Sequence, residues 1–189
     1  QPRKLQEQTA IMAAHPEVGM VFGASEYWRS WAGPSGDTEA QDHVPELGVP
    51  ADTVFSPPEL LALLYPLGIR TAPCPSDLLL RRTVLDATGG FEESFRGLYE
   101  DQAFLAKAYL STPVYVSGAS WTRYRIHRDS LMAVTRPQYA EVRLSFLPFL
   151  RDSLNAHDVQ DLRVWRLLRN APTRYGRRIP PPNSISGWR

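Results

Sequence analysis

The sequence predicts an α/β fold in which a largely buried, mixed sheet is flanked by helices. Two observations support this prediction. Short apolar segments rich in β-branched and aromatic residues occur at residues 18–27 and 113–117 and are typical of buried strands. Longer segments with helical periodicity lie around them. With 189 residues and 43% hydrophobic residues, the chain is long enough to form a domain with a substantial core.

Six segments have the composition and periodicity of helices. Proline near the first turn suits the starts at Pro2 and Pro57, and Gly89 suits the end of a short helix. The helix that follows the acidic pair contains neither proline nor glycine until Pro113. The expected helices are residues 2–14, 57–64, 82–87, 103–110, 139–154 and 159–169.

Strands are expected at residues 18–27, 113–117 and 121–127, where apolar or alternating residues dominate. Residues Thr71 to Leu80 also have an extended character, although Pro73 and Pro75 interrupt it. We therefore expect the sheet to receive strands near Val18, Thr71 and Val114.

Charge divides the chain unevenly. The net charge is +1, but the segment from Leu162 to Arg189 holds seven arginines and no acidic residue. Residues 1–161 therefore carry 14 basic and 20 acidic residues, a net charge of −6. We expect a domain at 1–155, a basic helix at 156–171 and a Pro/Arg-rich disordered tail at 172–189.

One cysteine, Cys74, excludes an internal disulfide and a multi-cysteine zinc site. We expect it to be a buried or half-buried free thiol, which agrees with a reducing compartment. No apolar run reaches the roughly 18 residues of a membrane span. The chain is therefore expected to be cytoplasmic, with peripheral contact to the inner membrane through the basic tail.

Two adjacent acids, Glu100 and Asp101, precede the predicted helix at 103–110. Unpaired N–H groups and the helix dipole stabilise negative charge at a helix N-terminus. A carboxylate there could accept a proton from an attacking hydroxyl, or it could serve only as a helix cap. Position alone favours the cap.

Cationic candidates lie near the end of the last predicted strand. Arg123 and Arg125 are two residues apart, so an extended strand places both on one face. They could bind a diphosphate, or they could pair with Glu100 or Asp101. His127 could ligate a divalent metal or contact a phosphate, although a lone histidine is more often a surface residue.

Three motifs occur in a characteristic order: Gly89-Gly90-Phe91-Glu92-Glu93, Tyr99-Glu100-Asp101-Gln102 and Trp121-Thr122-Arg123-Tyr124-Arg125-Ile126-His127. Together they resemble the second half of bacterial family-two glycosyltransferases, which have the GT-A fold. The segments Pro2-Arg3-Lys4-Leu5 and His15-Pro16-Glu17-Val18-Gly19 are also similar to that family. The resemblance covers residues 1–150 or so and rests on several ordered motifs.

The resemblance implies transfer of a sugar from a nucleotide-diphosphate donor to an acceptor hydroxyl on a glycan, a lipid-linked molecule or another compound, usually with inversion. Asp101 is then expected to be the general base, with Glu100 beside it, and His127 to join a divalent cation, Mn²⁺ or Mg²⁺, and the diphosphate. The substrate-binding residues expected from the resemblance are Gly89, Gly90, Phe91, Trp121, Arg123 and Arg125.

The chain departs from the family because these residues contain no Asp-x-Asp metal motif. The resemblance implies that a nucleotide-binding half precedes Gln1 in the same protein. The fold expected is thus a partial GT-A fold with C-terminal helices, and the fragment alone is expected to transfer sugar poorly or not at all.

Two other classes of function remain open from the residues. One is a non-enzymatic module in which the aromatic run of Tyr27, Trp28 and Trp31 and the arginines bind a glycan or an anionic polymer, although the same aromatics could form core. The other is an adaptor that binds phosphates or anionic lipid through the basic tail. The tail lacks the interleaved aromatic residues of a nucleic-acid stacking platform, so no nucleic-acid partner is expected.

Overall fold

The computed structural model describes residues 1–31, 41–127, 129–130, 134–135 and 138–175. A four-stranded sheet with the order β2-β4-β1-β3 forms its centre. The central strands β1 and β4 are parallel, whereas β3 and β2 join the two sides in antiparallel orientation. The sheet is therefore mixed, as predicted. The strands are β1 (Met20–Trp28), β2 (Thr53–Phe55), β3 (Leu79–Leu80) and β4 (Val114–Arg125).

Helices form at all six segments where they were expected. A single 3₁₀ turn, η2 (Pro75–Asp77), is added between the second and third of them. The helices are α1 (Lys4–Ala14), α2 (Glu59–Leu63), α3 (Arg82–Thr88), α4 (Glu100–Ser111), α6 (Tyr139–Ala156) and α7 (Leu162–Tyr175).

The prediction of two strands after α4 was wrong, because residues 114–125 form the single strand β4. Register shifts between Phe22 and Ser25 of β1 absorb the extra residues of β4. At this irregularity the backbone carbonyl of Ala119 comes within 2.2 Å of where a Cβ on Gly23 would lie. Only glycine allows this approach, and the shift joins the two apolar segments into one strand.

The segment from Thr71 to Leu80 is a strand only at its end. Pro75 lies at the start of η2, and both Pro73 and Pro75 lack the N–H group that a ladder requires. Leu79 and Leu80 alone pair with β1. The three-residue strand β2 was not predicted, because three residues are too few to show an alternating pattern.

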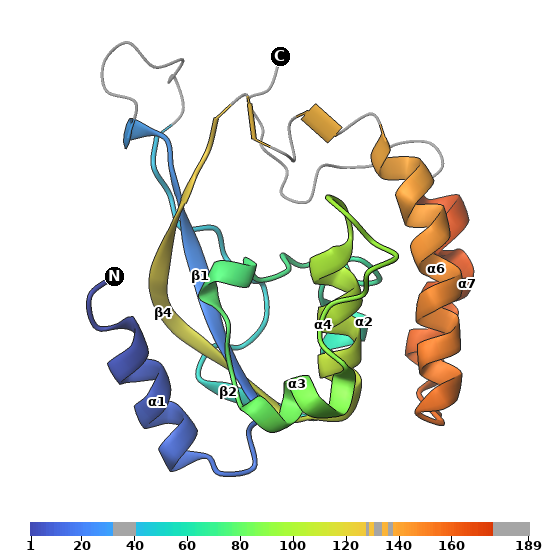
Figure 1. Ribbon diagram of the computed structural model, residues 1–189, viewed down its shortest axis with the longest axis horizontal. Coiled ribbons are helices and arrows are strands. Elements are labelled where there is room, and N and C mark those ends of the chain that lie inside the picture. The colour runs from blue at the N-terminus through green and yellow to red at the C-terminus, as the bar shows by residue number, and fades with distance from the viewer. Residues whose placement is uncertain (32–40, 128, 131–133, 136–137, 176–189) are drawn as a thin grey trace.

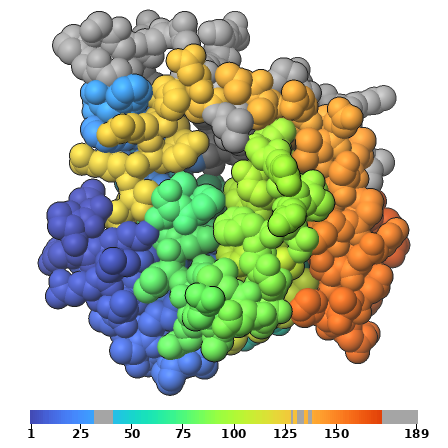
Figure 2. All heavy atoms as spheres, viewed as in Figure 1, coloured from blue at the N-terminus to red at the C-terminus, as the bar shows by residue number. Residues whose placement is uncertain are grey.

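The sheet has helices on both faces (Figure 1). On one face α1 covers a small cluster formed by Met12, Val18, Val21 and Trp121. On the other face lies the main core, in which α4 packs against the strands and against α2, α3 and α6. Figure 2 shows α1 in blue, the α3–α4 region in green and α6 in orange, in that order across one face of the molecule.

The C-terminal helices belong to the main core. Leu154 of α6 and Val164, Leu168 and Ala171 of α7 are buried in it. The segment expected as a basic helix at 156–171 overlaps α7, whose arginines are exposed on its outer side: Arg163, Arg166 and Arg169.

Two expectations about the chain ends and the membrane meet the structure only in part. Helix α7 continues to Tyr175, three residues beyond the expected start of the tail, and residues 176–189 lie outside the described part of the chain. Within the described part, no helix is both long and apolar enough to cross a membrane.

Candidate functional site

The turn that precedes α4 begins with two glycines. Gly89 and Gly90 both have φ of +71°, a conformation that favours glycine. Gly89 ends α3, and a Cβ at either position would meet no atom within 4 Å. Phe91 is 53% exposed and stacks on Phe104 of α4, with ring centroids 4.8 Å apart. These three residues thus present an open surface beside α4, and their role in binding substrate stays a prediction.

Asp101 is the second residue of α4, and the helix begins directly after Tyr99, which adopts φ of +66°. Its Oδ1 accepts a 2.7 Å hydrogen bond from the backbone N–H of Gln102. The side chain is half-buried, and burial raises the pKa of its carboxyl above the ordinary value, with the charge of Glu100 adding to the increase. Within the described residues no cation forms an ion pair with it, and Lys107 of the same helix pairs instead with Glu92 at 2.5 Å.

The negative charge of Asp101 interacts electrostatically with three phenol groups and one thiol group. Burial raises the pKa of each of these groups, and the Asp101 charge contributes to the increase. They come from four separate parts of the chain. We call these residues the Asp101 cluster: Asp101, Cys74, Tyr109, Tyr124 and Tyr139. Cys74 is half-buried and free, as predicted.

Polar atoms of α4 are left unsatisfied beside this cluster. Glu100 Oε2, Gln102 Oε1 and the Tyr109 hydroxyl are buried without a hydrogen-bond partner. Folded proteins leave few such atoms, since each one lowers the free energy of unfolding. The first turn of α4 therefore carries two unused acceptor oxygens, those of Glu100 and Gln102, whereas the Tyr109 hydroxyl lies deeper in the core near the other end of the helix.

A buried arginine holds the segment that leads into α4. Arg143 of α6 is 2% exposed, and its Nη1 donates to the hydroxyls of Tyr65 and Tyr99 at 3.4 and 3.3 Å. Its Nη2 donates to the carbonyl of Pro66 at 2.9 Å, and the two tyrosine hydroxyls are hydrogen-bonded to each other. The ring of Tyr139 packs against Tyr99, with centroids 5.1 Å apart. This arginine–tyrosine network fixes the residue before Glu100 and Asp101.

The strand β4 separates the predicted cations from Asp101. Side chains alternate between the two faces along a strand, and Tyr124 is flanked in sequence by Arg123 and Arg125. The charge of Asp101 contributes to the raised pKa of the Tyr124 phenol. Arg123 pairs with Glu26 at 2.6 Å, rather than with Glu100 or Asp101. The two arginines thus lie on the face of the sheet opposite Tyr124, and the expectation that they line a site with Asp101 is corrected on this ground.

A second cluster forms on that opposite face. The guanidinium carbon of Arg125 lies 5.3 Å and 5.8 Å from the ring centroids of Trp28 and Trp31, and that of Arg123 lies 5.4 Å from Trp28. His127 is exposed, with its ring edge-to-face against Trp31 at 6.0 Å. We call these residues the tryptophan–arginine patch: Trp28, Trp31, Arg123, Arg125 and His127.

Trp121 is a core residue, contrary to the expectation that it binds substrate. It is 3% exposed and packs with Met12 and Val21 beneath α1. Its indole N–H donates to Glu7 Oε2 of α1 at 2.7 Å. The polar atom of the ring is therefore already satisfied, and no surface is left for a ligand.

The described residues contain no group of three or more histidine, cysteine or acidic side chains that could hold a metal ion. The ring of His127 packs against Trp31. The described residues around His127 therefore do not by themselves form a Mn²⁺ or Mg²⁺ site, and its role in holding a divalent cation stays a prediction.

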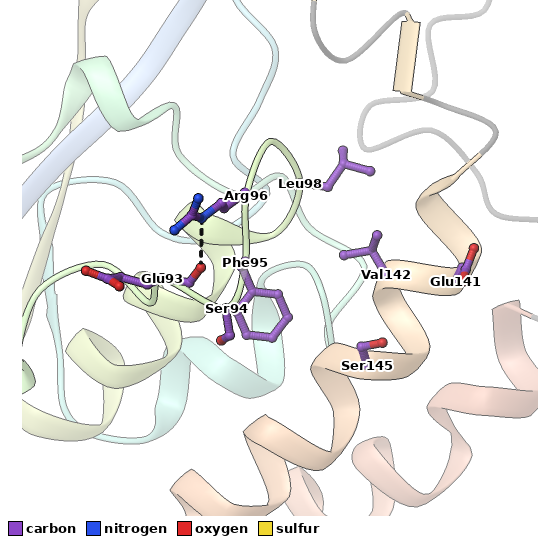
Figure 3. A pocket seen from close by; sticks show the side chains of 8 residues that line it. All are labelled: Glu93, Ser94, Phe95, Arg96, Leu98, Glu141, Val142 and Ser145. Atoms are coloured by element: carbon purple, nitrogen blue, oxygen red, sulfur yellow. Dashed lines mark hydrogen bonds between the residues drawn. The ribbon is translucent and has the colours of Figure 1, made fainter.

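Sequence reasoning missed a surface cleft of about 540 Å³ beside the segment that enters α4. Figure 3 shows Phe95 and Leu98 on this segment facing Val142 and Ser145 on α6. The residues that line it are Glu93, Ser94, Phe95, Arg96, Leu98, Glu141, Val142 and Ser145. Only the folded chain could reveal this cleft, because its two sides lie more than 40 residues apart in sequence.

Comparisons with protein-family models, with curated proteins and with solved structures give no match for this chain.

Proposed function

We propose that this chain is the acceptor-side portion of a glycosyltransferase in which Asp101 acts as the general base. The observation that supports this most is the environment of Asp101. Its carboxyl is half-buried and has a raised pKa, and no cation in the described residues pairs with it. A carboxylate held in this way accepts a proton more readily than one stabilised by an arginine or lysine.

The chemistry follows from that carboxylate. The hydroxyl of the acceptor attacks the anomeric carbon of a nucleotide-diphosphate sugar, and Asp101 takes the hydroxyl proton as the new bond forms. The diphosphate leaves from the opposite side, so the configuration at this carbon is inverted. The open surface of Gly89, Gly90 and Phe91 beside α4 suits the binding of the acceptor.

The donor half of the reaction is proposed from the sequence resemblance alone. In the family that the motifs resemble, the nucleotide and its divalent cation are bound by a preceding half of the same protein. No step of the reaction is assigned to His127, since the described part of the chain around it contains no metal site. The proposal thus rests on residues 89–101 and not on the predicted cations.

The test is Asp101→Asn in the protein that also contains the nucleotide-binding half. The amide keeps the acceptor for the Gln102 N–H but cannot take a proton. We expect kcat to fall about 10²- to 10⁴-fold, the range for loss of a general base, with donor affinity unchanged. Asp86→Asn, an exposed acid paired with Arg82 on α3, is the matched control. Full activity of the Asp101→Asn variant would refute the proposal.

A second candidate is a non-enzymatic module that binds a glycan or an anionic polymer. The tryptophan–arginine patch favours it, because Trp31 is 39% exposed and lies beside exposed Arg125 and His127. Aromatic rings bind sugar faces, and arginine binds anionic groups. This reading predicts that Trp31→Ala abolishes retention on a glycan column, while Asp101→Asn leaves it intact. Retention that survives Trp31→Ala argues against the module.

A further inference from the structure

One buried cation has no counter-charge among the residues that the structure describes. Arg29, which follows β1, is 7% exposed, and its Nε is buried without a hydrogen-bond partner. No ion pair or hydrogen bond is recorded for its side chain in the described part of the structure. Only its backbone is held by a hydrogen bond, in which its N–H donates to Asp42 Oδ1 at 2.6 Å.

The other arginines with little exposure donate hydrogen bonds from their guanidinium groups, which the described structure does not show for Arg29. Arg81 donates to the carbonyls of Val18 and Met12, both at 2.7 Å, and Arg143 donates to two phenols and a carbonyl. Burial of a charge without a partner destabilises the folded chain, so proteins rarely retain one without a ligand or a counter-ion to compensate it. Arg29 is thus the exception that requires an explanation.

The backbone at Arg29 is held rigidly in place. The carboxylate of Asp42 accepts the N–H groups of both Arg29 and Ser30 and also the Ser30 hydroxyl. These three hydrogen bonds keep the pKa of Asp42 below its ordinary value. The Asp42 carboxylate is thereby occupied by Arg29 N–H and by Ser30, and the side chain of Arg29 extends from a backbone position that these hydrogen bonds fix.

Arg29 lies where α/β proteins commonly bind ligands. It directly follows the carboxyl end of β1, beside the parallel strand β4. Its charge acts on the phenol of Tyr27, which burial gives a raised pKa and which lies 6.0 Å from the ring of Tyr124. Tyr124 in turn belongs to the Asp101 cluster. The uncompensated cation is thus on the Asp101 side of the sheet and not in the tryptophan–arginine patch.

We propose that Arg29 anchors an oxyanion site that takes a phosphoryl group. A guanidinium group binds two oxygens of a phosphate in a bidentate manner and is less strongly hydrated than an ammonium, which suits a buried position. The inference deepens the proposed function, because a phosphoryl group is what a nucleotide-diphosphate donor would leave behind. It requires neither a metal ion nor Asp101.

The experiment compares pyrophosphate binding by the 189-residue chain and three variants, with EDTA present to exclude metal. Arg29→Met removes the charge at similar volume, and Arg29→Lys keeps the charge but loses the bidentate fork. Arg123→Met on the opposite face is the matched control. Isothermal titration calorimetry measures affinity, and thermal denaturation measures stability with and without about 10 mM pyrophosphate.

We expect Arg29→Met to weaken pyrophosphate binding about 10- to 100-fold, as loss of a charge-assisted contact does, with Arg29→Lys intermediate and Arg123→Met unchanged. Pyrophosphate should raise the Tm of the original chain but not that of Arg29→Met. Without pyrophosphate, Arg29→Met should be at least as stable as the original chain, because an uncompensated charge has been removed.

Four results would overturn the inference. The first is that the original chain does not bind pyrophosphate, and the second is that Arg29→Met binds it as tightly as the original chain. The third is that Arg29→Met fails to fold, and the fourth is that the chain binds glucuronate, in place of pyrophosphate, in a manner that depends on Arg29. If uridine diphosphate bound more tightly than pyrophosphate, the site would be assigned to the phosphoryl group of a nucleotide. If the two bound equally, the site would be assigned to a phosphoryl group of any source. Full activity of Asp101→Asn would remove the transferase proposal and leave this site standing.

Discussion

At the scale of single residues, two charges lack an ion-pair partner in the described part of the chain. Asp101 has a raised pKa because burial removes water that would stabilise its charge, and Arg29 is buried without an acid among the described residues. The predicted cations Arg123 and Arg125 are instead engaged with Glu26 and with tryptophan rings. Residue type identified an acid and several arginines, but the surroundings decided which of them remain available.

The raised pKa of Asp101 predicts a pH-dependent stability. The folded chain binds this proton more tightly than the unfolded chain, so the free energy of unfolding falls as the pH rises from the ordinary carboxyl pKa of about 4 through the raised value. Asp101→Asn removes this loss of stability at higher pH. We expect its Tm to exceed that of the original chain by a few degrees at pH 7 and to converge with it near pH 3.

Thermal unfolding followed by circular dichroism across this pH range measures the difference. Asp86→Asn should show no such trend, because Asp86 is an exposed acid in a surface pair with Arg82. A lower Tm for Asp101→Asn at pH 7 would contradict the raised pKa.

The glycine turn permits a second prediction about a single residue. Gly89 has φ of +71° with open space around it, so Gly89→Ala should cost only the backbone strain of about 1–2 kcal/mol. Gly23→Ala should cost more, since its Cβ would meet the Ala119 carbonyl at 2.2 Å. Urea denaturation of the two variants measures both values, and the reverse order would refute the reading of the turn.

At the scale of elements, the N-terminus of α4 is held in place from α6. Arg143 donates to Tyr99, the residue directly before Glu100, and to the carbonyl of Pro66. Three segments distant in sequence therefore meet at one guanidinium group. The direction in which Asp101 faces is thus a property of the contact between α4 and α6 as much as of α4 itself.

Removal of this guanidinium group should be strongly destabilising. Arg143→Met removes the donor to two buried phenols and to the Pro66 carbonyl, and a buried polar group that loses its partner costs about 1–3 kcal/mol. Arg151→Met, an exposed arginine on the same helix, should change stability by less than about 0.5 kcal/mol. Urea denaturation measures the free energy of unfolding of both variants. Equal losses of stability would show that the arginine–tyrosine network contributes no more than a surface arginine does.

At the scale of the whole molecule, the C-terminal helices and the sheet share one core. Leu168 of α7 is 9% exposed within the main core, whereas Leu162 at the start of the same helix is 77% exposed. The basic outer side of α7 therefore belongs to a structural element and not to a detached arm.

This packing predicts opposite results for two leucines on one helix. Leu168→Ala should cost about 2–4 kcal/mol through lost burial and a cavity, and Leu162→Ala should be near neutral. Equilibrium unfolding in urea is the measurement. If both variants were equally stable, α7 would not contribute to the core.

The local sequence determines most of the secondary structure here. Periodicity, prolines and glycines within a few residues predict all six helices and the strand β1, because these signals act between neighbours in sequence. The acidic pair at the start of α4 was identifiable for the same reason. The strand β2 and the continuity of β4 were not predicted, since the first is too short for a pattern and the second depends on a register shift against β1.

The tertiary structure alone decided which side chains meet. It placed Trp121 beneath α1, put Asp101 on the side of β4 that carries Tyr124 and not the two arginines, and buried Arg29 without an acid among the described residues. A strand reverses the direction of its side chains at every residue, so one register shift changes which face a residue joins. Burial and electrostatic environment arise from segments distant in the chain. These are the quantities that decide whether an acid is a cap or a base.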